Sequence, residues 1–161
     1  MDTLVLANGL AICHVNRHET DFVYREVFVE RVYSKHGIEI HAGDCVFDVG
    51  ANIGLFSLFA RSQAPDVRVY AFEPAPALFE RLQRNLAAAG DEVRCIPFGL
   101  SDRDGEETFT YYPNYTILSG FAAQPERDRD LIVAGAGARA CEPAARKVLH
   151  AMAEDKLAER V

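Results

Sequence analysis

The stretch Val46-Phe47-Asp48-Val49-Gly50-Ala51-Asn52-Ile53-Gly54 combines an apolar strand, an acid and a glycine turn. The residues after it have the apolar spacing of a helix, and a second apolar strand then ends at Glu73. A strand, a glycine turn, a helix and an acid at the tip of the next strand are typical of a nucleotide-cofactor site in an open α/β sheet. The stretch therefore predicts an α/β fold with a ligand at the carboxyl ends of parallel strands.

The glycines and Glu73 indicate how such a ligand would be held. Gly50 and Gly54 let backbone approach a ligand closely, because glycine has no Cβ and permits positive φ. The helix after the turn directs unpaired N–H groups and the positive end of its dipole at an anion. An ionised Glu73 can accept from both hydroxyls of a ribose. The expected ligand therefore carries a ribose and an anionic group.

Position 52 indicates which cofactor the turn accepts. Dinucleotide sites carry G-x-G-x-x-G, whose middle glycine admits a pyrophosphate, whereas Asn52 leaves this chain with the spacing G-x-x-x-G. Asp48 lies two residues before Gly50 and favours a cationic or amino-bearing ligand over a diphosphate. S-adenosylmethionine meets these demands with its carboxylate, its amine and its ribose. A structural glycine turn and a nicotinamide-dependent oxidoreductase are the alternatives.

Three segments of the chain carry a resemblance to a known family. They are Asp48-Val49-Gly50-Ala51-Asn52-Ile53-Gly54, Tyr70-Ala71-Phe72-Glu73-Pro74 and Gly99-Leu100-Ser101-Asp102. They resemble the FkbM family of class I methyltransferases, and residues 19–26 and 108–114 resemble the domains of that family found in polyketide synthases and mixed peptide–polyketide synthetases. The resemblance implies a three-layer, Rossmann-like class I methyltransferase fold with S-adenosylmethionine as cofactor. The cofactor-binding residues that it implies are Asp48, Gly50, Ala51, Asn52, Gly54, Glu73, Pro74, Leu100 and Ser101.

The same resemblance implies a reaction and a setting. We expect methyl transfer to a hydroxyl on a carrier-tethered polyketide or related secondary metabolite, within a larger multidomain synthase. Such a transfer needs alignment of the reactants, and a base when the acceptor is a hydroxyl. Tyr24 and Glu30 precede the turn on a predicted helix and are weak candidates for facing the cofactor, while no catalytic residue is assigned. A truncated cofactor-binding module without activity is the non-enzymatic alternative.

Composition and charge argue against several other classes of protein. The chain has 161 residues, 49% of them hydrophobic, and a net charge of −7, which predicts one globular domain with a real core. This acidic balance, with no basic stripe, argues against a nucleic-acid partner. No apolar run reaches the ~20 residues of a membrane span. The four cysteines match no zinc pattern, so we predict no metal, and reduced thiols in a cytoplasmic protein are the default.

The periodicity of the chain predicts three parts. Residues 1–43 hold a hairpin around Asn8-Gly9 and a helix over about 21–36 that Thr20 caps. Residues 44–113 hold the cofactor-binding βαβ core, and residues 114–161 form a helical lid or insertion. The strands expected in the core are 45–49, 67–73, 93–98 and 107–112, with helices at about 53–62 and from 76 onward. The helices expected in the lid are 125–133 and 142–160, on either side of a joint at 134–140.

Strand 45–49 raises the question of how complete this fold is. The strand is apolar up to its acid, as in a strand covered on both faces. The resembling fold has seven strands in the order 3-2-1-4-5-7-6, and the first three are recognisable in this chain. We therefore expect the fold to be incomplete at its C-terminus, with one side of strand 45–49 unpaired.

Overall fold

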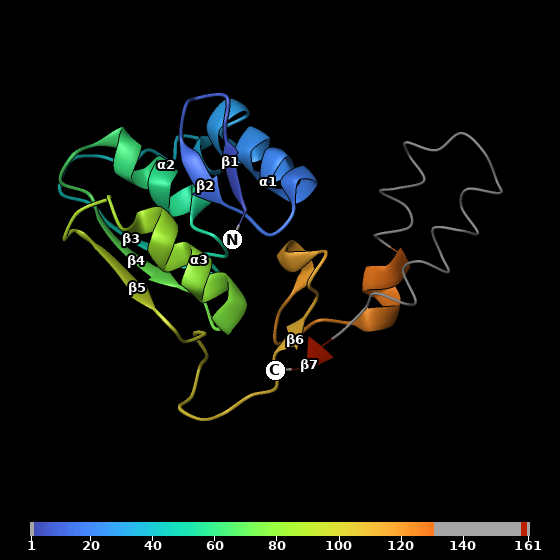
Figure 1. The fold of residues 1–161 in the computed structure, drawn as a ribbon. Helices are drawn as coiled ribbons and strands as arrows, with labels where there is room; N and C mark the ends of the chain where they lie inside the picture. The colour runs from blue at the N-terminus through green and yellow to red at the C-terminus, as the bar shows by residue number, and fades with distance from the viewer. Residues whose placement is uncertain (1, 131–158, 161) are drawn as a thin grey trace. The chain divides into compact units, whose positions relative to one another are not determined.

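The computed structural model of the chain describes residues 2–130 and 159–160. Contacts divide the chain into two compact units, Met1–Asp104 and Gly105–Val161. The first unit holds the hairpin, the parallel sheet and the helices that connect its strands (Figure 1). The finer division into 1–43, 44–113 and 114–161 stays a prediction.

A parallel sheet forms the centre of the first unit. Its strands are β3 (Cys45–Val49), β4 (Arg68–Phe72) and β5 (Val93–Ile96), in the spatial order β3-β4-β5. The helices α2 (Leu55–Gln63) and α3 (Pro76–Leu86) connect these strands, because neighbouring parallel strands need a crossover connection. The predicted α/β fold class is confirmed. β5 lies at an edge of the sheet, which agrees with Pro97 directly after it.

The core lies between the sheet and these two helices. Val69 of β4 packs with Ala60 of α2, and Ala71 of β4 packs with Leu82 and Leu86 of α3. All five side chains are buried. Alternate residues of β4 thus face the helices, and the leucine stripe predicted for α3 is its buried face.

The opposite face of the sheet is uncovered within the described residues. Phe47 and Val49 of β3 are 60% and 58% exposed, although their apolar strand predicted cover on both faces. Phe47 packs instead against Tyr70 and Phe72, with ring centroids 5.4 and 5.7 Å apart. The prediction of two covered faces is therefore wrong for this part of the chain. No described strand pairs with the outer edge of β3, so the expectation that one side of this strand is unpaired stays a prediction.

The N-terminal segment has the predicted hairpin but a different helix start. β1 (Thr3–Val5) pairs with β2 (Ala11–Cys13), and Gly9 in the connecting turn has a φ of 85°. Helix α1 (Arg17–Tyr24) begins four residues before the predicted position. Asn16 caps it by accepting from the Glu19 N–H at 3.2 Å. Thr20, the predicted cap, is buried inside the helix and donates its hydroxyl to the Asn16 carbonyl at 2.9 Å.

The helix also ends earlier than its periodicity predicted. It passes into the π-helical turn η1 (Arg25–Val29), and a separate 3₁₀ turn follows, η2 (Val32–Ser34). Arg31 lies between the two in a left-handed conformation, with a φ of 48°. A left-handed arginine has no signal in sequence, because L-residues other than Asn and Asp rarely adopt this conformation. The predicted helix to residue 36 is therefore wrong beyond this break.

The described part of the second unit differs from the structure that the sequence predicted for it. β6 (Thr110–Tyr111) pairs with β7 (Glu159–Arg160), and a 3₁₀ turn, η3 (Thr116–Leu118), and a helix at 125–130 complete its described part. Only two residues of predicted strand 107–112 pair. Residues 159–160 form a strand where helix 142–160 was predicted, because pairing with β6 overrides the local helix preference of an alanine-rich, charged segment. The joint at 134–140 and the rest of that helix lie outside the described residues.

Tyr112 holds the described part of the second unit together. Its side chain is fully buried, and its hydroxyl donates to the Asp128 carboxylate at 2.9 Å. Burial and the nearby Asp128 raise the pKa of Tyr112 to about 12. Nearby, the rings of Phe109 and Phe121 pack edge to face at 5.2 Å. Tyr112 is thus a core residue of this unit.

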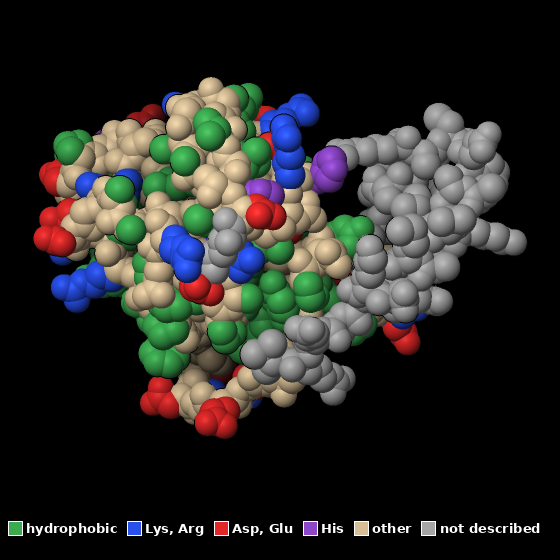
Figure 2. All heavy atoms as spheres, in the orientation of Figure 1, with side chains coloured by type: hydrophobic (Ala, Val, Ile, Leu, Met, Phe, Trp, Pro, Cys, Tyr) green, Lys and Arg blue, Asp and Glu red, His purple; other side chains and the backbone are tan. Residues whose placement is uncertain are grey.

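Three further observations concern the described residues. No described helix has both the length and the apolarity that crossing a bilayer demands. On the face shown in Figure 2, Lys and Arg side chains are scattered among acidic and neutral ones and form no stripe. Three of the four cysteines, Cys13, Cys45 and Cys95, are free thiols, and Cys141 lies outside the described residues.

Candidate cofactor site

The glycine turn lies between the end of β3 and the start of α2. Gly50, Asn52 and Gly54 have φ values of 78°, 52° and 90°, a conformation that glycine adopts without strain and asparagine tolerates. The N–H groups of Gly50 and Ala51 donate to the Phe72 carbonyl at 3.0 and 2.9 Å. These two bonds tie the turn to the end of β4.

Glu73 joins the turn to the strand beside it. Its Oε2 accepts from the Asn52 N–H and its Oε1 from the Ala75 N–H, both at 2.9 Å. The residue is 3% exposed. Each carboxylate oxygen can accept more than one hydrogen bond, so both oxygens keep capacity for the hydroxyls of a ligand. Glu73 thus holds the turn, a role that the sequence did not reveal.

Asp48 is a second buried acid, at the end of β3. The Ser57 hydroxyl on α2 donates to its Oδ2 at 2.6 Å, and both residues are buried. Burial raises the pKa of Asp48, while hydrogen bonds from the side chain and backbone of Ser57 lower it. Burial also raises the pKa of Glu73 against its two backbone hydrogen bonds, and the charge of Asp48 raises it further. Within the described residues, neither acid forms an ion pair.

The turn and its two acids fit the predicted cofactor. Two buried carboxylates without a cation are unfavourable, so a ligand ammonium beside Asp48 would stabilise its ionised form. A Cβ placed on Gly50 would meet no atom within 4 Å, so space for a ligand lies next to the backbone there. Glu73 keeps acceptor capacity for ribose hydroxyls. S-adenosylmethionine fits this donor and acceptor set, and when bound it would supply an activated methyl group.

The other residues predicted to bind the cofactor differ in how close they lie to the turn. Ala51 packs in the core with Ala71, and Pro74 follows Glu73 in a partly buried position. Leu100 and Ser101 are exposed on the loop after β5, and the carboxyl ends of parallel strands share one edge of the sheet. No described contact joins them to the turn, so their role stays a prediction.

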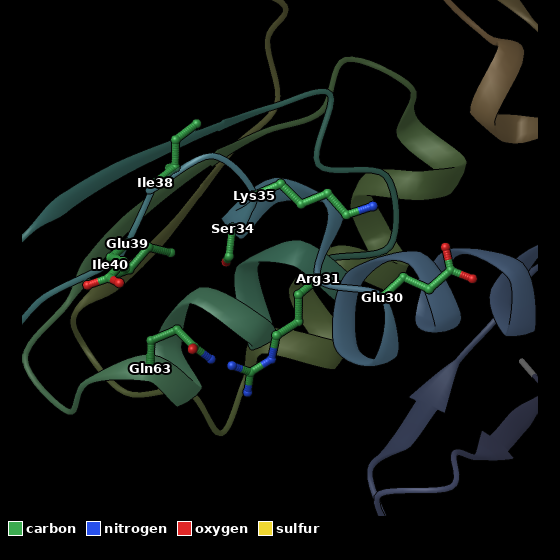
Figure 3. A pocket seen from close by; sticks show the side chains of 8 residues that line it. All are labelled: Glu30, Arg31, Ser34, Lys35, Ile38, Glu39, Ile40 and Gln63. Atoms are coloured by element: carbon green, nitrogen blue, oxygen red, sulfur yellow. The ribbon is translucent and has the colours of Figure 1, made fainter.

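Tyr24 and Glu30 make contacts elsewhere. Tyr24 stacks on Phe28 with ring centroids 5.2 Å apart, and Glu30 pairs with Arg25 at 2.7 Å. Glu30 also lines a hollow of about 400 Å³, where Figure 3 shows the ends of the Arg31 and Gln63 side chains pointing toward one another. Gln63 is the last residue of α2, so this hollow lies at the end of α2 remote from the turn. No described contact brings either candidate to the two buried acids.

Two residues of the site were missed from the sequence. Ser57 is fully buried and bonds Asp48, and Asn85 of α3 donates to the Ile53 carbonyl at 2.8 Å. Each is a polar residue on the apolar face of a predicted helix. Buried polar groups are almost always hydrogen-bonded. A polar residue on an apolar helix face therefore predicts a buried hydrogen bond, but it does not indicate which group the residue bonds.

Residues 48–138 match the family model described as the methyltransferase FkbM domain. The matched range begins at Asp48 and contains the whole turn, Glu73 and the loop after β5. The chain belongs to this family. The predicted resemblance of the three segments to the FkbM family is therefore confirmed.

Curated relatives of this FkbM-family chain include proteins of different length. It is 44% identical over 132 residues to the 31-O-demethyl-FK506 methyltransferase FkbM of Streptomyces tacrolimicus. The aligned region covers 82% of this chain and 51% of that protein. It is 47% identical over 129 residues to the AMB antimetabolite synthetase AmbE of Pseudomonas aeruginosa, over 79% of this chain and 6% of that protein. Identity to the methyltransferase sdnD of Sordaria araneosa is 36% over 113 residues, 69% of this chain and 43% of that protein. The chain thus spans about half the length of the first relative.

The two glycines of the turn should respond differently to substitution. Both have positive φ, so an alanine at either position is strained by about 1–2 kcal/mol. At Gly54 the added Cβ would also lie 2.8 Å from Leu82 Cδ1 in the core, and overpacking costs about 1–3 kcal/mol more. We expect Gly54→Ala to lower the free energy of unfolding, measured by urea denaturation, by more than Gly50→Ala. Equal losses would show that α3 does not confine the turn.

Proposed function

We propose that this chain binds S-adenosylmethionine and carries the cofactor site of a methyltransferase. The observation that carries the proposal is the pair of buried acids, Asp48 and Glu73, on either side of a glycine turn, with no cation of the described residues paired to them. A ligand with an ammonium group and a ribose satisfies both acids. Membership of the FkbM family supports the same cofactor.

Asn52 disfavours a nicotinamide dinucleotide at this turn. Its Oδ1 accepts from the N–H of Ile53, the next residue, at 2.9 Å. The side chain therefore lies against the turn, at the position where the dinucleotide fingerprint requires a glycine so that the pyrophosphate can approach. NAD⁺ is thus the appropriate negative control for a binding experiment.

We further propose that the acceptor is a hydroxyl on a carrier-tethered polyketide or related secondary metabolite. Support for a hydroxyl comes from a relative whose name places its methyl group on an oxygen, the 31-O-demethyl-FK506 methyltransferase. Support for a synthase setting comes from AmbE, in which the matched region is 6% of a much longer synthetase. Alignment of the acceptor with the sulfonium would be the main task of such a domain.

Calorimetric titration with S-adenosylhomocysteine tests the cofactor assignment. We expect saturable heat with S-adenosylhomocysteine and none with NAD⁺, because only the former brings an ammonium to Asp48. A folded chain that gives no heat with S-adenosylhomocysteine contradicts the assignment. A folded chain that binds NAD⁺ instead supports the oxidoreductase alternative.

The acceptor is tested separately with S-adenosylmethionine labelled in its methyl group. Matched carrier-tethered substrates would present a hydroxyl, an amine or an activated carbon at the same position. We expect label on the hydroxyl substrate alone. Label on the amine or carbon substrate would overturn the oxygen assignment and leave the cofactor assignment intact.

A further inference from the structure

Asn85 of α3 connects two segments that lie far from it in sequence. The N–H of Cys13, in β2, donates to Asn85 Oδ1 at 2.7 Å. Asn85 Nδ2 donates to the Cys13 carbonyl at 3.1 Å and to the Ile53 carbonyl at 2.8 Å. The side chain thus uses its acceptor and both donor hydrogens. A fully bonded, partly buried amide has one favourable orientation, so Asn85 fixes the distance between its two partners.

The contact with Cys13 secures the N-terminal hairpin on α3. Asn85 pairs with both the N–H and the carbonyl of Cys13, as a neighbouring strand would. Arg81, one turn earlier on α3, adds a bond from its Nε to the His14 carbonyl at 3.3 Å. The outer edge of β2 is therefore held by side chains of α3 rather than by another described strand.

The contact with Ile53 reaches the cofactor turn itself. Ile53 lies between Asn52, whose N–H donates to Glu73, and Gly54, which approaches Leu82 and Leu86 of α3 closely. α3 therefore supports the turn from behind through both packing and a hydrogen bond. A small rotation at Ile53 would change the direction of the N–H groups that follow it into α2.

We propose that Asn85 is a positioning residue that sets the conformation of the cofactor turn and couples it to the docked hairpin. This inference rests on the proposed S-adenosylmethionine site. Asn85 acts through the Ile53 carbonyl and does not itself touch the ligand. Its effect should fall on the part of the cofactor that the turn holds, the amino-acid end, rather than on the ribose that Glu73 is expected to hold.

Two ligands separate these effects, because 5′-methylthioadenosine has the adenosine of S-adenosylhomocysteine but lacks its amino-acid end. Asn85→Ala removes all three contacts, whereas Asn85→Asp keeps the acceptor for the Cys13 N–H and loses both donated bonds, to the Ile53 and Cys13 carbonyls. Loss of one or two hydrogen bonds in a site lowers affinity by about 5- to 30-fold. We expect both variants to lose that factor for S-adenosylhomocysteine in calorimetry while their affinity for 5′-methylthioadenosine stays unchanged. Gln83→Ala, at an exposed position of the same helix, is the matched control.

Two other results overturn the inference, and a third makes hydrogen exchange the deciding measurement. Equal losses for the two ligands would make Asn85 a residue of general stability, and no loss for either would show that the turn keeps its conformation without it. If the wild-type chain binds neither ligand, the proposed function fails, and hydrogen exchange of the ligand-free protein decides the inference instead. If the exchange rate of the Gly54 amide rises more from wild type to Asn85→Ala than the rates of the core amides of β4 do, the positioning role is supported. An equal rise at all these amides overturns it.

Discussion

Glu73→Gln should both destabilise the protein and remove most of its affinity for S-adenosylhomocysteine. Glu73 accepts from the N–H groups of Asn52 and Ala75 with different oxygens. Glutamine keeps one of these oxygens and turns an NH₂ group toward the other N–H, so one buried donor loses its acceptor. Such a loss costs about 1–3 kcal/mol of stability. The ribose loses a charged acceptor as well, which lowers affinity by about 10- to 150-fold.

The combined effect of this substitution is what tests the site. Urea denaturation gives the stability, and calorimetry at a temperature where the variant stays folded gives the affinity. Glu92→Gln makes the same chemical change at an exposed position between α3 and β5 and should alter neither quantity. A variant that loses stability but binds normally would show that Glu73 serves the turn alone. A variant that binds weakly at full stability would show that removing the buried charge of Glu73, whose pKa is raised, offsets the lost backbone contact.

Sequence reasoning anticipated the geometry of the candidate site best where that geometry depends on the local backbone. The glycines at 50 and 54 need positive φ, and Asp48 precedes a turn that a parallel sheet can use for a ligand. The strand, the turn and the following helix are neighbours along the chain, so their spacing records their arrangement. Glu73 required only one further step, because adjacent parallel strands end at the same edge of the sheet.

Sequence reasoning failed in two situations. In one, contacts between distant segments determine the structure, and in the other, two neighbouring residues are equally acceptable for the same role. Asn16 and Thr20 are both acceptable helix caps, and nothing local indicates that the helix starts at the first and buries the second. Asn85 bonds residues 72 and 32 positions away in the chain. Phe47 is apolar whether or not a second layer covers it. Each case depends on which elements contact one another in the fold. The pattern of residues along a single element does not indicate its neighbours.

Asp48→Asn should have the opposite effect on stability from Glu73→Gln, although it also weakens cofactor binding. Burial raises the pKa of Asp48 above its ordinary value of 3.8, which means that ionised Asp48 is unfavourable in the ligand-free fold. Asparagine carries no charge, and the two lone pairs of its Oδ1 can still accept from the hydroxyl and the backbone N–H of Ser57, which both bond the carboxylate of Asp48. The ligand ammonium, however, loses its charged partner, and a charge-assisted contact is worth about 1.5–3 kcal/mol, or about 10- to 150-fold in affinity.

The pH dependence gives this prediction a sign that can be checked. Because the folded pKa of Asp48 is raised, the folded state binds more protons than the unfolded state between the two pKa values. The free energy of unfolding therefore falls as pH rises through that window, and the loss persists at neutral pH. Asparagine does not titrate and removes this contribution, so the advantage of Asp48→Asn is expected at pH 7 and should vanish below about pH 4. Urea denaturation of both proteins across this range measures the difference.

Cofactor binding should show the reverse dependence on pH at the same residue. An ammonium beside Asp48 favours its ionised form, so binding releases a proton wherever Asp48 is partly protonated in the free protein. Affinity for S-adenosylhomocysteine should therefore fall as pH is lowered, and calorimetry in buffers of different ionisation heat should detect the released proton. Asp48→Asn should lose that share of the proton release, while the share of Glu73, whose pKa is also raised, remains. A variant that is less stable at pH 7 and binds with unchanged affinity would place the ligand ammonium elsewhere and make Asp48 a structural partner of Ser57.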